Sequence, residues 1–99
     1  SACSLEEAIA AARNVGLYSL SALQTELESL DRVQQIIRTF GMVNSAPGFS
    51  EHPKVIDGFS NLMIDIFGEA GRGARSAVGM SSLPFNISVE VEMTVKLFD

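Results

Sequence analysis

The first third of the chain has apolar residues three or four positions apart, which is the period of one face of an α-helix. This spacing predicts a helix over about residues 5–29. Ser4 and Glu7 have the spacing of a capping box, in which each side chain bonds the backbone N–H of the other residue. Gly16 lies in the middle of the stretch and either weakens the helix or admits a close neighbour. The apolar positions are Leu5, Ile9, Ala12, Gly16, Leu20, Leu23, Leu27 and Leu30.

A strand-like run follows over residues 33–43, and residues 44–48 then have the composition of a turn. Successive side chains of a strand point to opposite faces. Because both faces of this run are largely apolar, we expect it to be a central strand. Alternation assigns Ile37, Thr39, Gly41 and Val43 to one face, and Ile36, Arg38, Phe40 and Met42 to the other.

The second half of the chain predicts one helix and two strands. The helix should run from about Pro53 to Gly68, because proline suits the first helical position and glycine suits the C-terminal cap. A short strand is expected over residues 75–80, with a turn at 82–84. The last strand is the clearest pattern, with apolar and polar residues in strict alternation. Its apolar face comprises Ile87, Val89, Val91, Met93, Val95 and Leu97, and Ser88, Glu90, Glu92, Thr94, Lys96 and Phe98 form the other.

The predicted order of elements is helix, strand, helix, strand, strand, which indicates an α+β fold. Two helices can cover one face of a small mixed sheet, so we expect a single domain over residues 1–99. The edges and the second face of such a sheet would stay uncovered. Association of several copies through the sheet is the simplest way to protect them.

Composition supports a packed core and narrows the classes of partner. Hydrophobic residues make up 46% of the 99 positions, and the net charge is −5, from seven basic and twelve acidic residues. Nucleic acid is not an expected partner, because non-specific binding to phosphates needs clustered Lys and Arg. No apolar stretch could span a bilayer and no signal peptide is visible, so we expect a cytoplasmic protein without membrane contact. One cysteine, Cys3, and one histidine, His52, make neither a disulfide nor a zinc site.

Several short segments, in this order and spacing, resemble the RidA/YjgF family. They are Leu-Glu-Glu-Ala at 5–8, Leu-Asp-Arg-Val at 30–33, the stretch 44–68, the run from Gly-Ala-Arg-Ser to Leu-Pro at 73–84, and Val-Glu-Val-Glu at 89–92. The resemblance implies a chorismate-mutase-like fold, a homotrimer and ligand clefts between subunits. It also implies hydrolysis of reactive 2-imino or 2-enamino acids to 2-oxo acids and ammonia, without a metal or an organic cofactor.

The resemblance assigns roles to individual residues of this chain. Arg75 matches the arginine that grips the substrate carboxylate, and a guanidinium fork suits that task. Glu90 matches the glutamate that positions or activates the attacking water. Glu92 lies two residues further on the same strand face, about 7 Å away, and is a candidate supporting residue. Apart from the resemblance, an arginine at a strand start and glutamates on a polar strand face are typical of solvated surface.

Two departures from the family pattern keep a second hypothesis open. Many active members have a cysteine two residues after the arginine, where this chain has Ala77. The family domain also begins with a β-hairpin before the first helix, so we expect a domain that is short at its N-terminus. The single tyrosine, Tyr18, lies in the first helix and is expected to be a packing residue. The alternative is therefore a non-catalytic member that binds a small carboxylate metabolite, or a structural oligomer. RNA cleavage, a third class, would need a basic groove.

Overall fold

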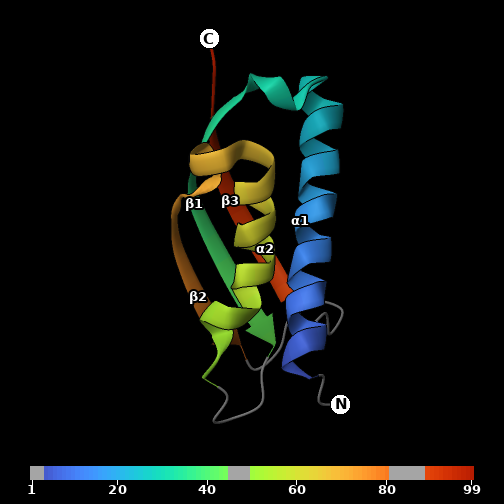
Figure 1. Ribbon diagram of the computed structural model, residues 1–99, viewed down its shortest axis with the longest axis vertical. Coiled ribbons are helices and arrows are strands. Elements are labelled where there is room, and N and C mark those ends of the chain that lie inside the picture. Colours follow the sequence, from blue (N-terminus) through green and yellow to red (C-terminus); the bar gives the residue numbers. More distant parts are fainter. Residues whose placement is uncertain (1–3, 45–49, 81–88) are drawn as a thin grey trace.

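The computed structural model describes residues 4–44, 50–80 and 89–99, and the chain follows the predicted order of helices and strands (Figure 1). The predicted turns at 45–48 and 82–84, and residues 87–88 of the last strand, lie outside the described residues. The elements are α1 (Leu5–Leu27), the 3₁₀ turn η1 (Leu30–Arg32), β1 (Val33–Asn44), α2 (His52–Phe67), the 3₁₀ turn η2 (Gly68–Gly71), β2 (Ala74–Met80) and β3 (Val89–Leu97).

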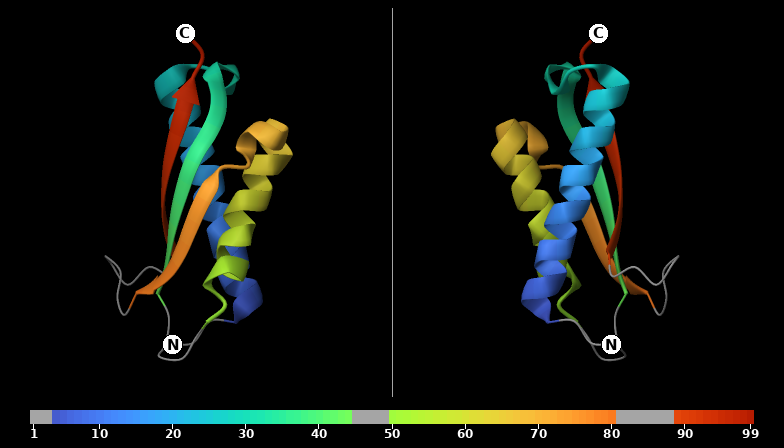
Figure 2. Two further views of the ribbon diagram at one scale, coloured as in Figure 1. Left: turned by 90° about the vertical axis from the view of Figure 1, so that its left-hand side faces the viewer. Right: turned by 90° about the vertical axis from the view of Figure 1, so that its right-hand side faces the viewer.

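The three described strands form a mixed sheet in the order β2-β1-β3, with β1 in the centre as predicted. β1 is parallel to β2 and antiparallel to β3. Both helices lie on one side of this sheet, and in the right-hand view of Figure 2 α1 crosses in front of the strands with α2 beside it. The predicted α+β architecture, with two helices on one face of a mixed sheet, is therefore confirmed.

The start of α1 has the predicted capping box. The Ser4 backbone N–H donates to Oε1 of Glu7, and the Glu7 backbone N–H donates to Oγ of Ser4, both at 3.1 Å. The hydrogen bond that the Ser4 backbone N–H donates to the Glu7 carboxylate, and secondly a contribution from the Ser4 side chain, lower the pKa of Glu7 below its usual value. The cap thus stabilises the fold above the usual pKa of glutamate, and this contribution is lost as the pH falls through the lowered pKa.

The ends of the two helices explain where the chain turns. α1 stops at Leu27, two residues earlier than predicted, because Glu28 adopts a left-handed conformation with φ 69°. The Ser29 side chain then accepts a hydrogen bond from the Asp31 backbone N–H and caps the following turn. Gly68 ends α2 as predicted, at φ 64°, a conformation that glycine adopts without a steric cost.

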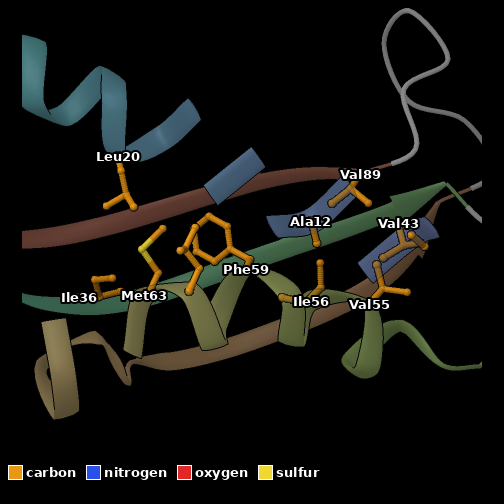
Figure 3. Packing of buried hydrophobic residues seen from close by; sticks show 11 residues of the cluster. Ala12, Leu20, Ile36, Val43, Val55, Ile56, Phe59, Met63 and Val89 are labelled. Atoms are coloured by element: carbon orange, nitrogen blue, oxygen red, sulfur yellow. The ribbon is translucent and has the colours of Figure 1, made fainter. Parts of the chain in front are cut away.

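The hydrophobic core lies between the helices and the sheet, and it corrects one prediction. Figure 3 shows Ile36 near Met63 of α2, and Ile36 is fully buried whereas Ile37 is 46% exposed. The assignment of Ile37 to the face that it was expected to share with Thr39 and Val43 is therefore wrong. The pairing of β1 with β3 is irregular between Ile36 and Arg38, and such a bulge moves one residue to the other face.

Glycines allow α1 and α2 to pack closely. A Cβ atom added at Gly16 would lie 2.8 Å from Cδ2 of Leu62, so this glycine admits a close neighbour from α2. A Cβ atom added at Gly58 of α2 would collide with the backbone carbonyl oxygen of Ile9 in α1. The second contact is the stricter one, because a backbone atom cannot move aside by a change of rotamer.

We expect Gly58→Ala to destabilise the protein by about 1–3 kcal/mol, since the overpacking must separate the two helices. This loss is net of the better helix propensity of alanine, which favours the variant by about 1 kcal/mol. Urea unfolding measures the difference, with Ser21→Ala on the exposed side of α1 as the control. A Gly58→Ala variant as stable as the wild type would contradict the close helix contact.

Candidate functional site

A polar cleft lies between α2, the η2 turn and the start of β2. Its volume is about 250 Å³, which suits a small metabolite rather than a drug-sized ligand. Met63 and Ile64 form its apolar wall, and glycines of the η2 turn and of the connection to β2 line another part. Its polar lining residues are Thr39, Asp57, Ser60, Asn61, Arg72 and Arg75.

Arg75 lies in this cleft and makes three contacts with α2. In the parallel pairing, Arg75 is opposite the buried Thr39, so its side chain lies on the helix side of the sheet. Its Nη1 lies 2.7 Å from Oδ1 of Asp57 and donates to Oγ of Ser60 at 3.1 Å. Its Nη2 donates to the carbonyl oxygen of Pro53 at 3.2 Å. α2 therefore holds the guanidinium where it lines the cleft.

Part of the hydrogen-bonding capacity of Arg75 is still open. A guanidinium has five N–H donors, and the three contacts with α2 use only donors of Nη1 and Nη2. Among the described residues, the Nε–H group has no partner. The side chain is 28% exposed, so a ligand can reach it. The second arginine of the cleft, Arg72, is bound at 3.1 and 3.3 Å by the two carboxylate oxygens of Glu69.

Glu90 and Glu92 lie on the other face of the sheet. In β3, Glu90 is opposite Met42 and Glu92 is opposite Phe40, whereas the alternate residues Val89 and Val91 pack with the core. The two glutamates share one face, as alternation requires. β1 stands between β3 and β2, and two strand spacings amount to roughly 10 Å. Within one chain, the structure therefore does not bring Glu90 or Glu92 to the cleft of Arg75.

The structure also shows the positions of Ala77 and Tyr18, for which the sequence led to expectations. Ala77 lies opposite Gly41 on the helix side of β2 and packs against the core, next along the face from Arg75. Tyr18 is 81% exposed on α1, so its expected packing role is wrong. The helical period alone does not predict this exposure, because a tyrosine at the edge of an apolar stripe can point either toward the core or toward solvent.

Asp57 and Ser60 are site residues that the sequence analysis did not identify. They are three positions apart on α2 and hence share one face of the helix. In the sequence, the only indication of a site here is this pair of polar residues beside the apolar stripe of the helix. The signal gains a chemical meaning only when β2 brings Arg75 to the same place.

Two helices packed on one face of a mixed three-stranded sheet place the described residues in the α+β class. The chain belongs to the family described as "YjgF/chorismate mutase-like, putative endoribonuclease", whose sequence profile matches residues 2–97. The predicted family is thereby confirmed.

Proteins from three organisms are similar to this chain in sequence, and two of them also in structure. Protein TCP17 of Trypanosoma cruzi is 45% identical over 92 residues, which are 92% of this chain and 58% of that protein. The crystal structure of the protein Atu1372 from Agrobacterium tumefaciens, of unknown function, superposes with a TM-score of 0.94 at 39% identity, over 97% of this chain and 62% of that one. A "putative endoribonuclease" from Shewanella oneidensis MR-1 gives a TM-score of 0.93 at 34% identity, over 98% and 64%. The chain thus spans about three fifths of the length of these relatives.

The described residues lack two other features that would bear on function. None of the helices there is long and apolar enough to cross a membrane. No group of three or more His, Cys, Asp or Glu side chains in the same part of the chain could hold a metal ion.

Proposed function

We propose that this protein hydrolyses 2-imino or 2-enamino acids to 2-oxo acids and ammonia, in a cleft shared by two subunits of a homotrimer. The observation that carries the proposal is the cleft around Arg75, the residue that the family resemblance assigns to the substrate carboxylate. Contacts with Asp57, Ser60 and Pro53 hold the guanidinium in place before a ligand arrives. Such preorganisation lowers the cost of binding and orienting a substrate.

Arg75 anchors the small carboxylate ligand in this proposal. A carboxylate oxygen accepts from the open Nε–H, and a second oxygen accepts from the remaining donor of Nη2. A guanidinium also presents a rigid planar fork that matches the two oxygens of a carboxylate.

Glu90 reaches the ligand from a second subunit. Both described helices lie over the opposite face of the sheet from the one that carries Glu90 (Figure 2). Rings such as a trimer form through head-to-tail interfaces, in which two different surfaces of the subunit meet. An interface of this kind can place the sheet face of one subunit against the Arg75 cleft of the next.

The proposed reaction is an addition followed by an elimination. The Glu90 carboxylate takes a proton from water as the water oxygen bonds to C2 of the protonated imine, and the C=N pair moves to nitrogen. The proton then passes from Glu90 to the amino nitrogen of this intermediate. The C–N bond breaks, the C=O bond forms, and the hydroxyl proton returns to Glu90. Ammonia takes up that proton and leaves as ammonium, beside the 2-oxo acid.

The release of ammonia and 2-oxo acid tests this proposal. An amino-acid oxidase generates the imino acid in the assay, and the protein is expected to accelerate its hydrolysis in a saturable manner. Amino acids with several different side chains should be compared. Absence of any acceleration across this set would contradict the proposed reaction.

A second function, binding of a carboxylate metabolite without catalysis, is favoured by one observation. Ala77 stands on the same strand face as Arg75, where many active members have a cysteine. A protein with this function would bind 2-oxo acids through Arg75 and show no turnover of imines. RNA cleavage has less support, because both arginines of the cleft are ion-paired, with Asp57 and Glu69, and the cleft is not a basic groove.

A further inference from the structure

Two side chains of opposite charge lie next to each other in the candidate cleft. Oδ1 of Asp57 is 2.7 Å from Nη1 of Arg75, and both residues line the cleft. The Asp57 side chain is 46% exposed, and its second oxygen has no partner among the described residues. Asp57 can therefore accept a hydrogen bond from a ligand while it keeps its contact with Arg75.

A 2-imino acid has the same pair of charges on two adjacent carbon atoms. Its carboxylate is negative, and its nitrogen is positive when the imine is protonated. The 2-oxo acid that hydrolysis produces has a neutral carbonyl oxygen in place of this nitrogen. A carboxylate of the protein attracts the cationic nitrogen and repels the lone pairs of the carbonyl oxygen.

From this match we infer that Asp57 selects the ligand by its nitrogen. Arg75 holds the ligand carboxylate, and the free oxygen of Asp57 accepts a hydrogen bond from the cationic nitrogen. This inference rests on the proposed function and names the substrate class more narrowly, as acids with a positively charged nitrogen on C2. The same contact keeps the imine protonated, which is the form that water attacks, and favours release of the oxo acid.

The rest of the cleft agrees with such a ligand. Ser60 and Asn61 add neutral polar groups near Asp57, and Arg72 is occupied by Glu69. Arg75 and Asp57 are the oppositely charged pair within the lining, because Glu69, the partner of Arg72, does not line the cleft. One anion site and one cation site fit a small zwitterion better than they fit a dianion.

Asp57→Asn tests the inference, because it removes the charge and nearly keeps the shape. The probes are L-alanine and pyruvate, which have the same three-carbon skeleton and differ in a cationic nitrogen against a carbonyl oxygen. Calorimetric or NMR titration of the wild type should give tighter binding of alanine. The variant should bind alanine roughly 10- to 100-fold more weakly, the usual effect of losing a charge-assisted hydrogen bond. Pyruvate should bind the variant as well as it binds the wild type, or better.

Two results of these titrations would overturn the inference about Asp57. If alanine and pyruvate lose the same affinity, Asp57 only positions Arg75, and the inference is wrong. A wild type that binds alanine no better than pyruvate overturns it as well. Asp57→Glu, which keeps the charge on a longer side chain, should recover part of the preference for alanine. Asp65→Asn, an exposed position of α2 outside the cleft, should change neither affinity.

The same variants separate this inference from the proposed reaction. A preference for alanine that depends on Asp57, without turnover of imines, would contradict the hydrolysis and leave the ligand assignment standing. Turnover that survives Asp57→Asn with unchanged kcat/KM would contradict the role of Asp57 and leave the hydrolysis standing.

Discussion

Arg75→Ala is expected to lower kcat/KM for imine hydrolysis by roughly 30- to 4000-fold. The variant lacks the group that holds the ligand carboxylate, and truncation of one partner of a hydrogen-bonded charge pair costs about 2–5 kcal/mol, with each 1.4 kcal/mol worth tenfold. Stability should change little, by about 1 kcal/mol or less, because the ion pair with Asp57 is partly exposed to solvent. Steady-state kinetics and thermal unfolding of the same preparations measure both quantities.

Two further variants make the Arg75 result specific. Arg72→Ala removes the other arginine of the cleft, which is already bound by Glu69, and should reduce kcat/KM far less. Arg75→Lys keeps a positive charge but loses the planar fork, so it should restore only part of the lost affinity. Equal effects of Arg72→Ala and Arg75→Ala would show that the cleft attracts the ligand by general charge instead of a specific clamp.

Glu90→Gln is expected to lower kcat by about 10²- to 10⁴-fold, the usual contribution of a general acid and base, with little change in KM. Glutamine keeps the size of the side chain and removes its ability to take the proton from water. Glu90→Gln should therefore change mainly kcat, whereas Arg75→Ala, which acts mainly on binding, should change mainly KM.

Glu92→Gln is the matched control for Glu90, because the two residues lie on the same face of the same strand. Its effect on kcat should be small if Glu92 only supports its neighbour. A Glu90→Gln variant with wild-type kcat would contradict the assignment, and a larger loss in Glu92→Gln would transfer the role to that residue.

Much of the fold could be predicted from the periodicity of the sequence, since the elements are long and their patterns are regular. The apolar character of both faces of residues 33–43 placed this strand in the centre of the sheet, where it lies. The exchange of Ile36 and Ile37 escaped prediction, because a bulge leaves the identity of the residues unchanged and alters only which way they point. The left-handed Glu28, which ends α1, likewise has no sequence signal as strong as glycine would give.

The candidate site was predictable only in part. Arg75 could be proposed from its resemblance to a family motif, but not from local pattern, since an arginine at a strand start is usually solvated. The separation of Arg75 and Glu90 by the sheet depends on how β2 and β3 pair with β1. Asp57 belongs to α2, and the sequence pattern does not show that this helix brings Asp57 into contact with Arg75 of β2. Such juxtapositions arise from tertiary packing, which one sequence does not encode as a local signal.

The central claim, that one site uses Arg75 of one subunit and Glu90 of another, is tested most directly by mixing two inactive variants. Arg75→Ala and Glu90→Gln subunits, unfolded and refolded together, should recover about one quarter of the wild-type activity. Each site of a cyclic trimer needs an intact Arg75 from one subunit and an intact Glu90 from its neighbour. In an equal mixture each of these has one chance in two, so one site in about four is complete. The same variants refolded separately should stay inactive. A mixture that also stays inactive, although its subunits have exchanged, would show that no site combines Arg75 of one subunit with Glu90 of another, and would contradict the shared site.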